Sequence, residues 1–429
     1  MKPLLVCAAV LAAAPLSAQA PSTPVNEVAT ERAPLHQRAA DALAVLQGTR
    51  PAQEVFAPAF LQQVSAAQLA EITRQLVVSH GTLVAIASVT PDGSASATIA
   101  IRFERAVGHG VMAIEAEAPH RITGLVLQRF ETSDDSTDKV AAELRALPGV
   151  VNAWFGPLET GSPRLAINPD RRLALGSTFK LFVLSALSNA VATGDHRWDE
   201  VVPLAERSFP SGLMQEWPTG APVTLQTLAT LMLQISDNTA TDQLIALLGR
   251  ERVEAEFRRF APAADGPTLP FLTSREMFVI KADPALRERY ARAGTAERRR
   301  ILAALPARPV PLEVVARAFA GNPLAVDTIE WFASPAELAK LLRELTRPEH
   351  ARARDLLATN RSLDPVAAAR WRYVGFKGGS EPGVLNLTWL LQDQAGRWHM
   401  LTVGRTNAAA PIGRETDDLA KRLLALAAP

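Results

Sequence analysis

The stretch Ser177-Thr178-Phe179-Lys180 opens a long apolar segment in which Lys180 is the only charged residue from Leu173 to Gly194. This pattern predicts a largely buried helix that Gly194 ends. Residues three positions apart share a helix face, so the Ser177 hydroxyl and the Lys180 amine are expected to meet. Burial favours the neutral amine, which can take a proton from a hydroxyl. The segment thus predicts a nucleophilic serine; the alternative is that Ser177 caps the helix and Lys180 reaches solvent.

Length and composition indicate a globular protein with large cores. The 429 residues leave room for two or three domains, and hydrophobic residues make up 48% of the chain against 21% charged residues. The net charge is +1, with acidic and basic residues interspersed. This balance gives no indication of nucleic-acid binding.

Residues 1–20 have the pattern of a cleavable secretory signal. Lys2 precedes an apolar centre, and Ala18-Gln19-Ala20 supplies small residues for cleavage after Ala20. We expect a periplasmic or secreted protein with no transmembrane helix after cleavage. The single cysteine, Cys7, lies inside this segment, so the mature chain is expected to have neither disulfides nor a thiol nucleophile. The scattered histidines predict no metal site, and no cofactor is expected.

The remaining chain divides into two predicted domains. Residues 21–135 combine helical segments with four strand-like runs between 83 and 130, which indicates a small α+β domain with an antiparallel sheet. A polar run at 131–138 marks the boundary. Residues 140–429 begin with a helix and two strand-like runs, continue through a helical body, and end with three strand-like runs and a helix. This order predicts one antiparallel sheet flanked by helices.

A second polar motif, Ser236-Asp237-Asn238, lies between two apolar helical segments. Short polar side chains in a helix-to-helix turn can point into a cleft. The alternative is ordinary helix capping by these residue types.

A third motif, Lys377-Gly378-Gly379, follows the apolar run from Trp371 to Phe376. Paired glycines are poor strand residues unless something approaches the backbone closely, as a substrate would. We expect the motif to end the strand and its lysine to attract an anionic substrate group. The alternative is a simple bulge or turn.

The order and settings of these three motifs resemble those of class A β-lactamases and penicillin-binding proteins. The resemblance rests on Leu175 to Leu181, Ile235 to Ala240 and Phe376 to Ser380, and it covers residues 140–429. It implies a serine hydrolase with a class A β-lactamase-like domain.

The resemblance also implies chemical roles for the first two motifs. Ser177 would be the nucleophile that becomes acylated, and Lys180 would accept or relay its proton. Ser236 would pass a proton to the leaving group. Asp237 would orient its own turn.

Other motif residues would bind the substrate. Asn238 would bind the substrate amide and also hold Lys180, and Lys377 would bind a substrate carboxylate. Gly378, Gly379 and Ser380 would line the substrate strand, where the backbone N–H of Ser380 would join an oxyanion hole.

Two features depart from the family pattern. Gly378 stands where members usually carry a hydroxyl residue. The Glu-x-x-Leu-Asn string that activates the hydrolytic water in class A β-lactamases is absent between Asn238 and Lys377. Glu276 and Glu330 are the candidates for that carboxylate, although both can equally be surface or salt-bridge residues.

The domain order is similar to that of the two-domain hydrolases associated with clavulanic acid biosynthesis, whose N-terminal part resembles steroid isomerases and cyclases. The expected function is an exported hydrolase that acts through an acyl-enzyme on a β-lactam, or on a related amide or ester. The alternatives are an esterase or D,D-peptidase with the same site, or a non-catalytic protein that binds β-lactams or peptidoglycan.

Overall fold

The computed structural model describes residues 25–132, 135–159, 161–262, 266–305, 311–363 and 365–427. The predicted signal at residues 1–20 lies outside them. The chain divides into two compact units, Met1–Asp135 and Ser136–Pro429. No helix within the described ranges is both long enough and apolar enough to cross a membrane.

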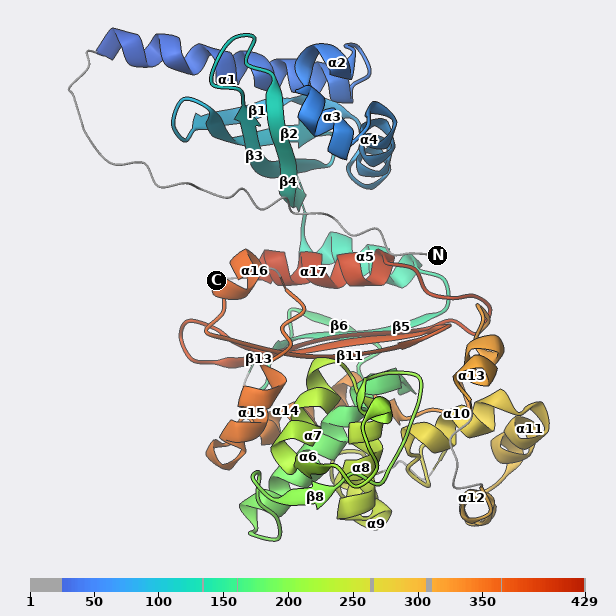
Figure 1. Ribbon diagram of the computed structural model, residues 1–429. Coiled ribbons are helices and arrows are strands. Elements are labelled where there is room, and N and C mark those ends of the chain that lie inside the picture. The colour runs from blue at the N-terminus through green and yellow to red at the C-terminus, as the bar shows by residue number, and fades with distance from the viewer. Residues whose placement is uncertain are drawn as a thin grey trace. The chain divides into compact units, whose positions relative to one another are not determined.

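The N-terminal unit is a four-stranded antiparallel meander in the order β1-β2-β3-β4, accompanied by helices (Figure 1). Its core gathers apolar side chains from helix α1 and from the sheet, such as Leu35 and Ile99. This arrangement confirms the predicted helix-plus-antiparallel-sheet region. The elements are α1 (Val25–Leu46), α2 (Ala52–Val55), α3 (Pro58–Gln63), α4 (Ala66–His80), β1 (Leu83–Pro91), β2 (Ser96–Phe103), β3 (Ala106–Ile114) and β4 (Ile122–Thr132).

The C-terminal unit is built around a five-stranded antiparallel sheet in the order β11-β12-β13-β5-β6. Successive residues of β12 point to opposite faces, so Trp389 packs in one core while Leu390 packs in the other. Its near-continuous apolar sequence follows from burial on both faces. The strands are β5 (Val150–Pro157), β6 (Leu165–Ile167), β11 (Tyr373–Glu381), β12 (Val384–Gln392) and β13 (Trp398–Thr406).

Helices cover both faces of this sheet, as predicted (Figure 1). One layer contains α5 (Thr137–Ala146) and α17 (Glu415–Ala427), whose apolar faces meet the sheet. The other layer contains α6 (Lys180–Ala192), α7 (Leu225–Gln234), α8 (Asn238–Leu248), α9 (Arg250–Phe260), α14 (Pro335–Leu345) and α15 (Ala351–Leu357). The three motifs all lie on the side of this second layer.

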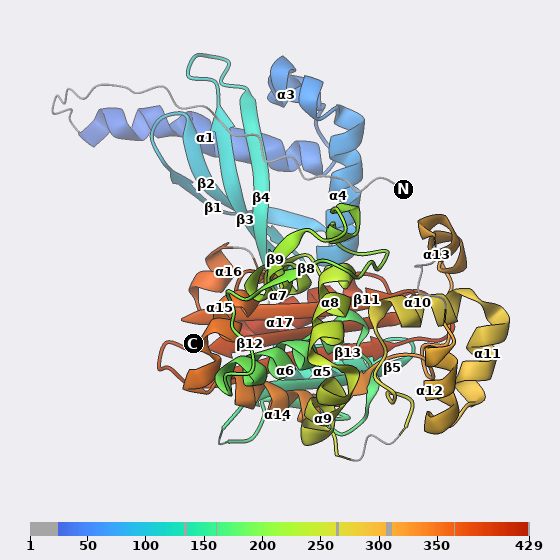
Figure 2. The same cartoon turned by 60° about the horizontal axis from the view of Figure 1, so that its bottom comes forward.

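A group of helices between α9 and α14 gathers at one end of the sheet (Figure 2). It comprises α10 (Ser274–Ala282), α11 (Pro284–Arg292), α12 (Thr295–Ala303) and α13 (Leu312–Ala318). Gly294 separates α11 from α12 and stands at the N-cap of the second helix. The remaining short elements are β7 (Leu173–Ala174), η1 (Gly176–Phe179), β8 (Val201–Pro203), η2 (Met214–Glu216), β9 (Pro222–Thr224), β10 (Phe332–Ala333), η3 (Pro348–His350) and α16 (Pro365–Ala369).

Candidate active site

Ser177 lies in the short helix η1, directly before α6. Gly176 precedes it with φ of 49°, in the left-handed region that favours glycine. A β-carbon on Gly176 would lie 2.9 Å from the backbone nitrogen of Ser380, so only glycine lets strand β11 come this close. Ser177 is thus held beside the strand that carries the third motif.

Lys180 is fully buried at the start of α6. Its amine donates to the backbone oxygen of Ser236 at 2.6 Å, to the Ser236 hydroxyl at 3.0 Å and to Asn238 Oδ1 at 2.7 Å. Burial lowers its pKa well below the ordinary value, and the positive charge of Lys377 adds to this effect. The site therefore holds an amine whose neutral form is favoured.

The expected hydrogen bond between Ser177 and Lys180 is not formed in the described part of the chain. The three contacts of the Lys180 amine all go to the second motif instead. Two of these acceptors, the Ser236 backbone oxygen and Asn238 Oδ1, are carbonyl oxygens, which compete with the Ser177 hydroxyl for the amine. The Ser177 hydroxyl is left on the cavity wall, next to the motif that Lys180 contacts.

The second motif forms a rigid turn between α7 and α8, as predicted. Ser236 takes a positive φ of 58°, which is rare for a residue with a side chain. Asp237 caps α8 by accepting from the backbone of Ala240, and it also accepts from the backbone N–H groups of Leu213 and Met214. Because this carboxylate ties together two segments, the position of Ser236 is firmly fixed.

Lys377 approaches the same serine from β11. Its side chain is buried, and its amine donates to the Ser236 hydroxyl at 3.1 Å and to the Gly378 oxygen at 2.6 Å. Burial lowers the pKa of Lys377 to about 7. One hydroxyl, that of Ser236, therefore bridges two buried amines, those of Lys180 and Lys377.

The prediction that the glycine pair ends its strand is wrong, because β11 runs through both glycines and pairs with β12 as far as Glu381. The reason is local packing against η1. A β-carbon on Gly379 would lie 2.1 Å from the Leu175 oxygen and 2.4 Å from the Ser177 nitrogen. Glycine at 379 therefore allows the strand to lie directly against the backbone of Ser177.

These residues meet at one cavity of about 220 Å³. Lys180 and Lys377 lie behind its wall and reach it through Ser236. The cavity is lined by Gly176, Ser177, Phe179, Pro210, Ser211, Ser236, Asn238, Ser274, Met277, Phe278, Glu330, Trp331, Gly378, Gly379, Ser380 and Glu381.

The two candidate carboxylates lie in different settings. Glu276 caps α10 together with Thr273 and is paired with Arg250 at 2.6 Å. Glu330 lines the cavity with Ser177, and its carboxylate accepts from Lys281 at 3.0 Å. The geometry therefore favours Glu330 over Glu276 for chemistry at this site.

Sequence reasoning missed Lys281 and Glu381. Both contact one another as an ion pair, and Glu381 also lines the cavity. One signal for Glu381 was present, because residues 377, 379 and 381 share a face of one strand. Lys281 gave no comparable signal, being one basic residue in an otherwise amphipathic helix.

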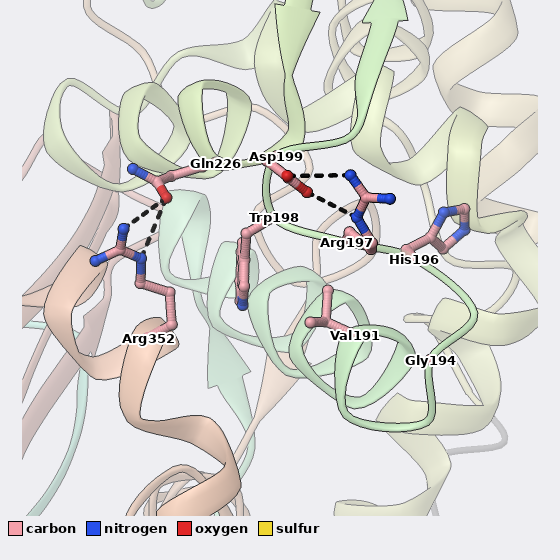
Figure 3. A pocket seen from close by; sticks show the side chains of 8 residues that line it. All are labelled: Val191, Gly194, His196, Arg197, Trp198, Asp199, Gln226 and Arg352. Carbon is pink, nitrogen blue, oxygen red and sulfur yellow. Dashed lines mark hydrogen bonds and ion pairs between the residues drawn. The ribbon is translucent and has the colours of Figure 1, made fainter.

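A second cavity of about 650 Å³ lies at the far end of α6. Figure 3 shows its polar side chains turned toward one another. Arg197 is paired with Asp199, and Arg352 donates to Gln226 on either side of Trp198. Its lining includes no residue of the three motifs.

The family model described as the β-lactamase enzyme family matches residues 135–386, which is more than half of the chain. The protein therefore belongs to that family, and the predicted relationship to serine β-lactamases and penicillin-binding proteins is confirmed. No curated protein matches the sequence.

Solved structures of β-lactamases and of a protein named PBP-A are similar to the chain. They include a β-lactamase from Sphaerobacter thermophilus (20% identity, 68% of this chain, 94% of that chain, TM-score 0.47). PBP-A is also similar (16% identity, 67% of this chain, 92% of that chain, TM-score 0.46). So is an ancestral class A β-lactamase (20% identity, 68% of this chain, 97% of that chain, TM-score 0.46).

Proposed function

We propose that the protein is a serine hydrolase that forms an acyl-enzyme at Ser177 with a β-lactam or a related amide or ester. One observation carries the proposal. The Ser236 hydroxyl accepts from Lys180 at 3.0 Å and from Lys377 at 3.1 Å, and it borders the same cavity as Ser177. A nucleophile, a buried amine and a hydroxyl that can carry protons are the parts an acyl-transfer site needs.

In the proposed acylation, neutral Lys180 accepts the proton of the Ser177 hydroxyl, and the serine oxygen bonds to the substrate carbonyl carbon. The backbone N–H groups of Ser177 and Ser380 would stabilise the oxyanion, each donor contributing about 3–4 kcal/mol. The carbon–nitrogen bond of a lactam, or the carbon–oxygen bond of an ester, then breaks. Ser236 gives its proton to the leaving atom and regains one from Lys180.

Substrate binding in this proposal uses the remaining motif residues. Asn238 would contact the substrate amide, and Gly378, Gly379 and Ser380 would present the edge of β11. Protonated Lys377 would bind a carboxylate on the leaving-group side. Its neighbours in the described chain are the neutral Ser236 hydroxyl and the Gly378 carbonyl, so a substrate carboxylate would be its first anionic partner.

Hydrolysis of the acyl-enzyme requires an activated water, and we propose Glu330 for this step. Glu330 lines the cavity, whereas Glu276 is not part of its lining. Both carboxylates are paired with a cation, Glu330 with Lys281 and Glu276 with Arg250. Lys281 holds Glu330 at 3.0 Å and so restrains the proposed base. We expect deacylation to be slow compared with acylation, which makes the intermediate easy to observe.

The test is intact mass spectrometry after incubation with a fluorescent penicillin and, separately, with a fluorophosphonate. We expect one adduct with each reagent on the wild-type protein and none on Ser177→Ala. Absence of both adducts, or their persistence in Ser177→Ala, would contradict the proposal. Parallel turnover assays with nitrocefin, a p-nitrophenyl ester and a D-Ala-D-Ala peptide would separate β-lactamase, esterase and D,D-peptidase activity; multiple turnover would exclude a purely binding role.

We also propose that the protein is exported after cleavage behind Ala20. The support is the charged start, the apolar centre and the Ala18-Gln19-Ala20 sequence. N-terminal sequencing of the protein recovered outside the cytoplasm should begin at Pro21. Recovery of intact Met1 in the cytoplasmic fraction would contradict export.

A further inference from the structure

Three buried charged side chains meet at the cavity beyond the motif residues. Lys281, on α10, donates to Glu330 at 3.0 Å and forms a second ion pair with Glu381 at the end of β11. The side chains of Lys281 and Glu330 are 0% exposed, and that of Glu381 is 7% exposed. Both carboxylates line the same cavity as Ser177.

This cluster has one cation for two carboxylates. Glu381 Oε2 is buried and accepts no hydrogen bond from the described residues. Burial raises the pKa of Glu381 to about 8, and the charge of Glu330 and a hydrogen bond between the two carboxyl groups contribute in the same direction. In the free protein a proton therefore balances the second carboxylate. A cation entering the cavity could replace that proton and satisfy the unpartnered oxygen.

A cation, Lys377, lies on the other side of the nucleophile from the two carboxyl groups. Lys377 and Glu381 lie on the same face of β11, four residues apart, which corresponds to roughly 13 Å along a strand. Gly379, midway between them, lies against the backbone nitrogen of Ser177. The nucleophile thus stands between an amine that lacks an anionic partner and a carboxyl group with one oxygen paired to Lys281 and a second oxygen that accepts no hydrogen bond from the described residues.

We infer that the preferred substrate is zwitterionic, with a carboxylate on the leaving-group side at Lys377 and an ammonium group on the acyl side at Glu381. This inference rests on the proposed acylation of Ser177 for its orientation. An ammonium group fits the unpartnered Glu381 oxygen because charge-assisted hydrogen bonds are the strongest that such a buried oxygen can accept. Glu381 is here a specificity-determining residue rather than a participant in bond breaking.

The test compares three penicillins that share one nucleus. Benzylpenicillin has a neutral phenylacetyl side chain, ampicillin adds an α-ammonium group, and N-acetylampicillin keeps the added bulk without the charge. We expect ampicillin to acylate Ser177 at least about tenfold faster than the other two, as one charge-assisted hydrogen bond allows. In Glu381→Gln the three rates should converge, while Glu313→Gln, the same change at an exposed position of α13, should keep the preference.

A binding measurement separates this inference from the proposed chemistry. In Ser177→Ala, where no acyl-enzyme can form, calorimetry should still find tighter binding of ampicillin than of benzylpenicillin. Equal affinities there and equal acylation rates in the wild-type protein would overturn the inference, as would a preference that survives Glu381→Gln. Failure of every compound and of the fluorophosphonate to label Ser177, with the binding preference retained, would overturn the acylation proposal and leave the ammonium site standing. If Glu381→Gln does not fold, the three wild-type rates decide the question.

Discussion

Lys180 and Lys281 are both fully buried lysines, yet their surroundings assign them opposite chemistry. Lys180 has only uncharged acceptors, Ser236 and Asn238, and it lies near a second cation. Lys281 has two carboxylates. Burial disfavours the charge of each amine. At Lys281 the two carboxylates outweigh burial and raise the pKa, whereas at Lys180 the charges of Asp237 and Asp242 do not offset burial and the charge of Lys377, so its pKa falls.

The comparison shows that burial alone does not determine what a lysine does. A buried amine with carboxylate partners remains an ammonium ion and stabilises the fold around it. A buried amine with carbonyl and hydroxyl partners loses its proton more readily than an ordinary lysine and can act as a base. The two lysines therefore predict opposite outcomes for the same substitution.

The largest expected effect is on acylation. Lys180→Met should slow the labelling of Ser177 by an uncharged fluorophosphonate by about 10²–10⁴-fold, the usual contribution of a positioned base. Lys281→Met should slow it far less, because Lys281 contacts Glu330 and Glu381 rather than the serines. Equal rate losses in the two variants would break the comparison.

The second effect is on stability, where Lys281→Met should have a larger effect than Lys180→Met. Lys281→Met leaves the buried Glu330 carboxylate unpaired and should lower the free energy of unfolding by about 3–5 kcal/mol. Lys180→Met should cost only about 1 kcal/mol, because the lost hydrogen bonds are offset by removal of a buried amine. Urea titration of both variants checks this, and a larger loss in Lys180→Met would contradict it.

The third effect concerns the contact between β11 and η1. Gly379→Ala brings a β-carbon against backbone atoms of Leu175 and Ser177, which cannot move aside. We expect acylation to fall by about 10²–10³-fold, as when an oxyanion donor is misplaced. Gly378→Ala is the matched control, since its β-carbon would lie close to the end of the Phe376 side chain at 2.8 Å, whereas the Asn386 backbone oxygen would be at an ordinary contact distance of 3.6 Å. Similar rates for the two variants would rule out this packing role.

The smallest effect is a pH dependence that involves Lys377, whose pKa is about 7. Only its protonated form attracts a carboxylate, so kcat/KM for a penicillin should fall as pH rises above about 7. The decline should approach roughly tenfold per pH unit. A neutral ester, which lacks the carboxylate, should show no such decline. A decline of the same size with both substrates would show that Lys377 does not recognise the carboxylate.

Much of the site could be predicted from the sequence because each motif has a local signature. Ser177 and Lys180 are three residues apart, and Asp237 lies where a helix cap is expected. The continuation of β11 through Gly378 and Gly379 could not be predicted, because glycine is a poor strand residue by itself. Packing against η1 overrides that preference, and only the tertiary structure reveals it.

The cluster of Lys281, Glu330 and Glu381 could not be predicted from the sequence for a different reason. Lys281 and Glu381 are 100 positions apart, and Lys281 and Glu330 are 49 apart. Ion pairs between such distant residues leave no local pattern. The Glu-x-x-Leu-Asn string is absent between Asn238 and Lys377, so no motif marked their place.

The most direct test of the central claim measures the rate of Ser177 labelling by an uncharged fluorophosphonate between pH 5 and 10. If neutral Lys180 is the base, the rate should rise with pH and level off well below 10.5, the ordinary pKa of a lysine amine. A rate that continues to climb up to that value, or a Lys180→Met variant with an unchanged profile, would contradict the account.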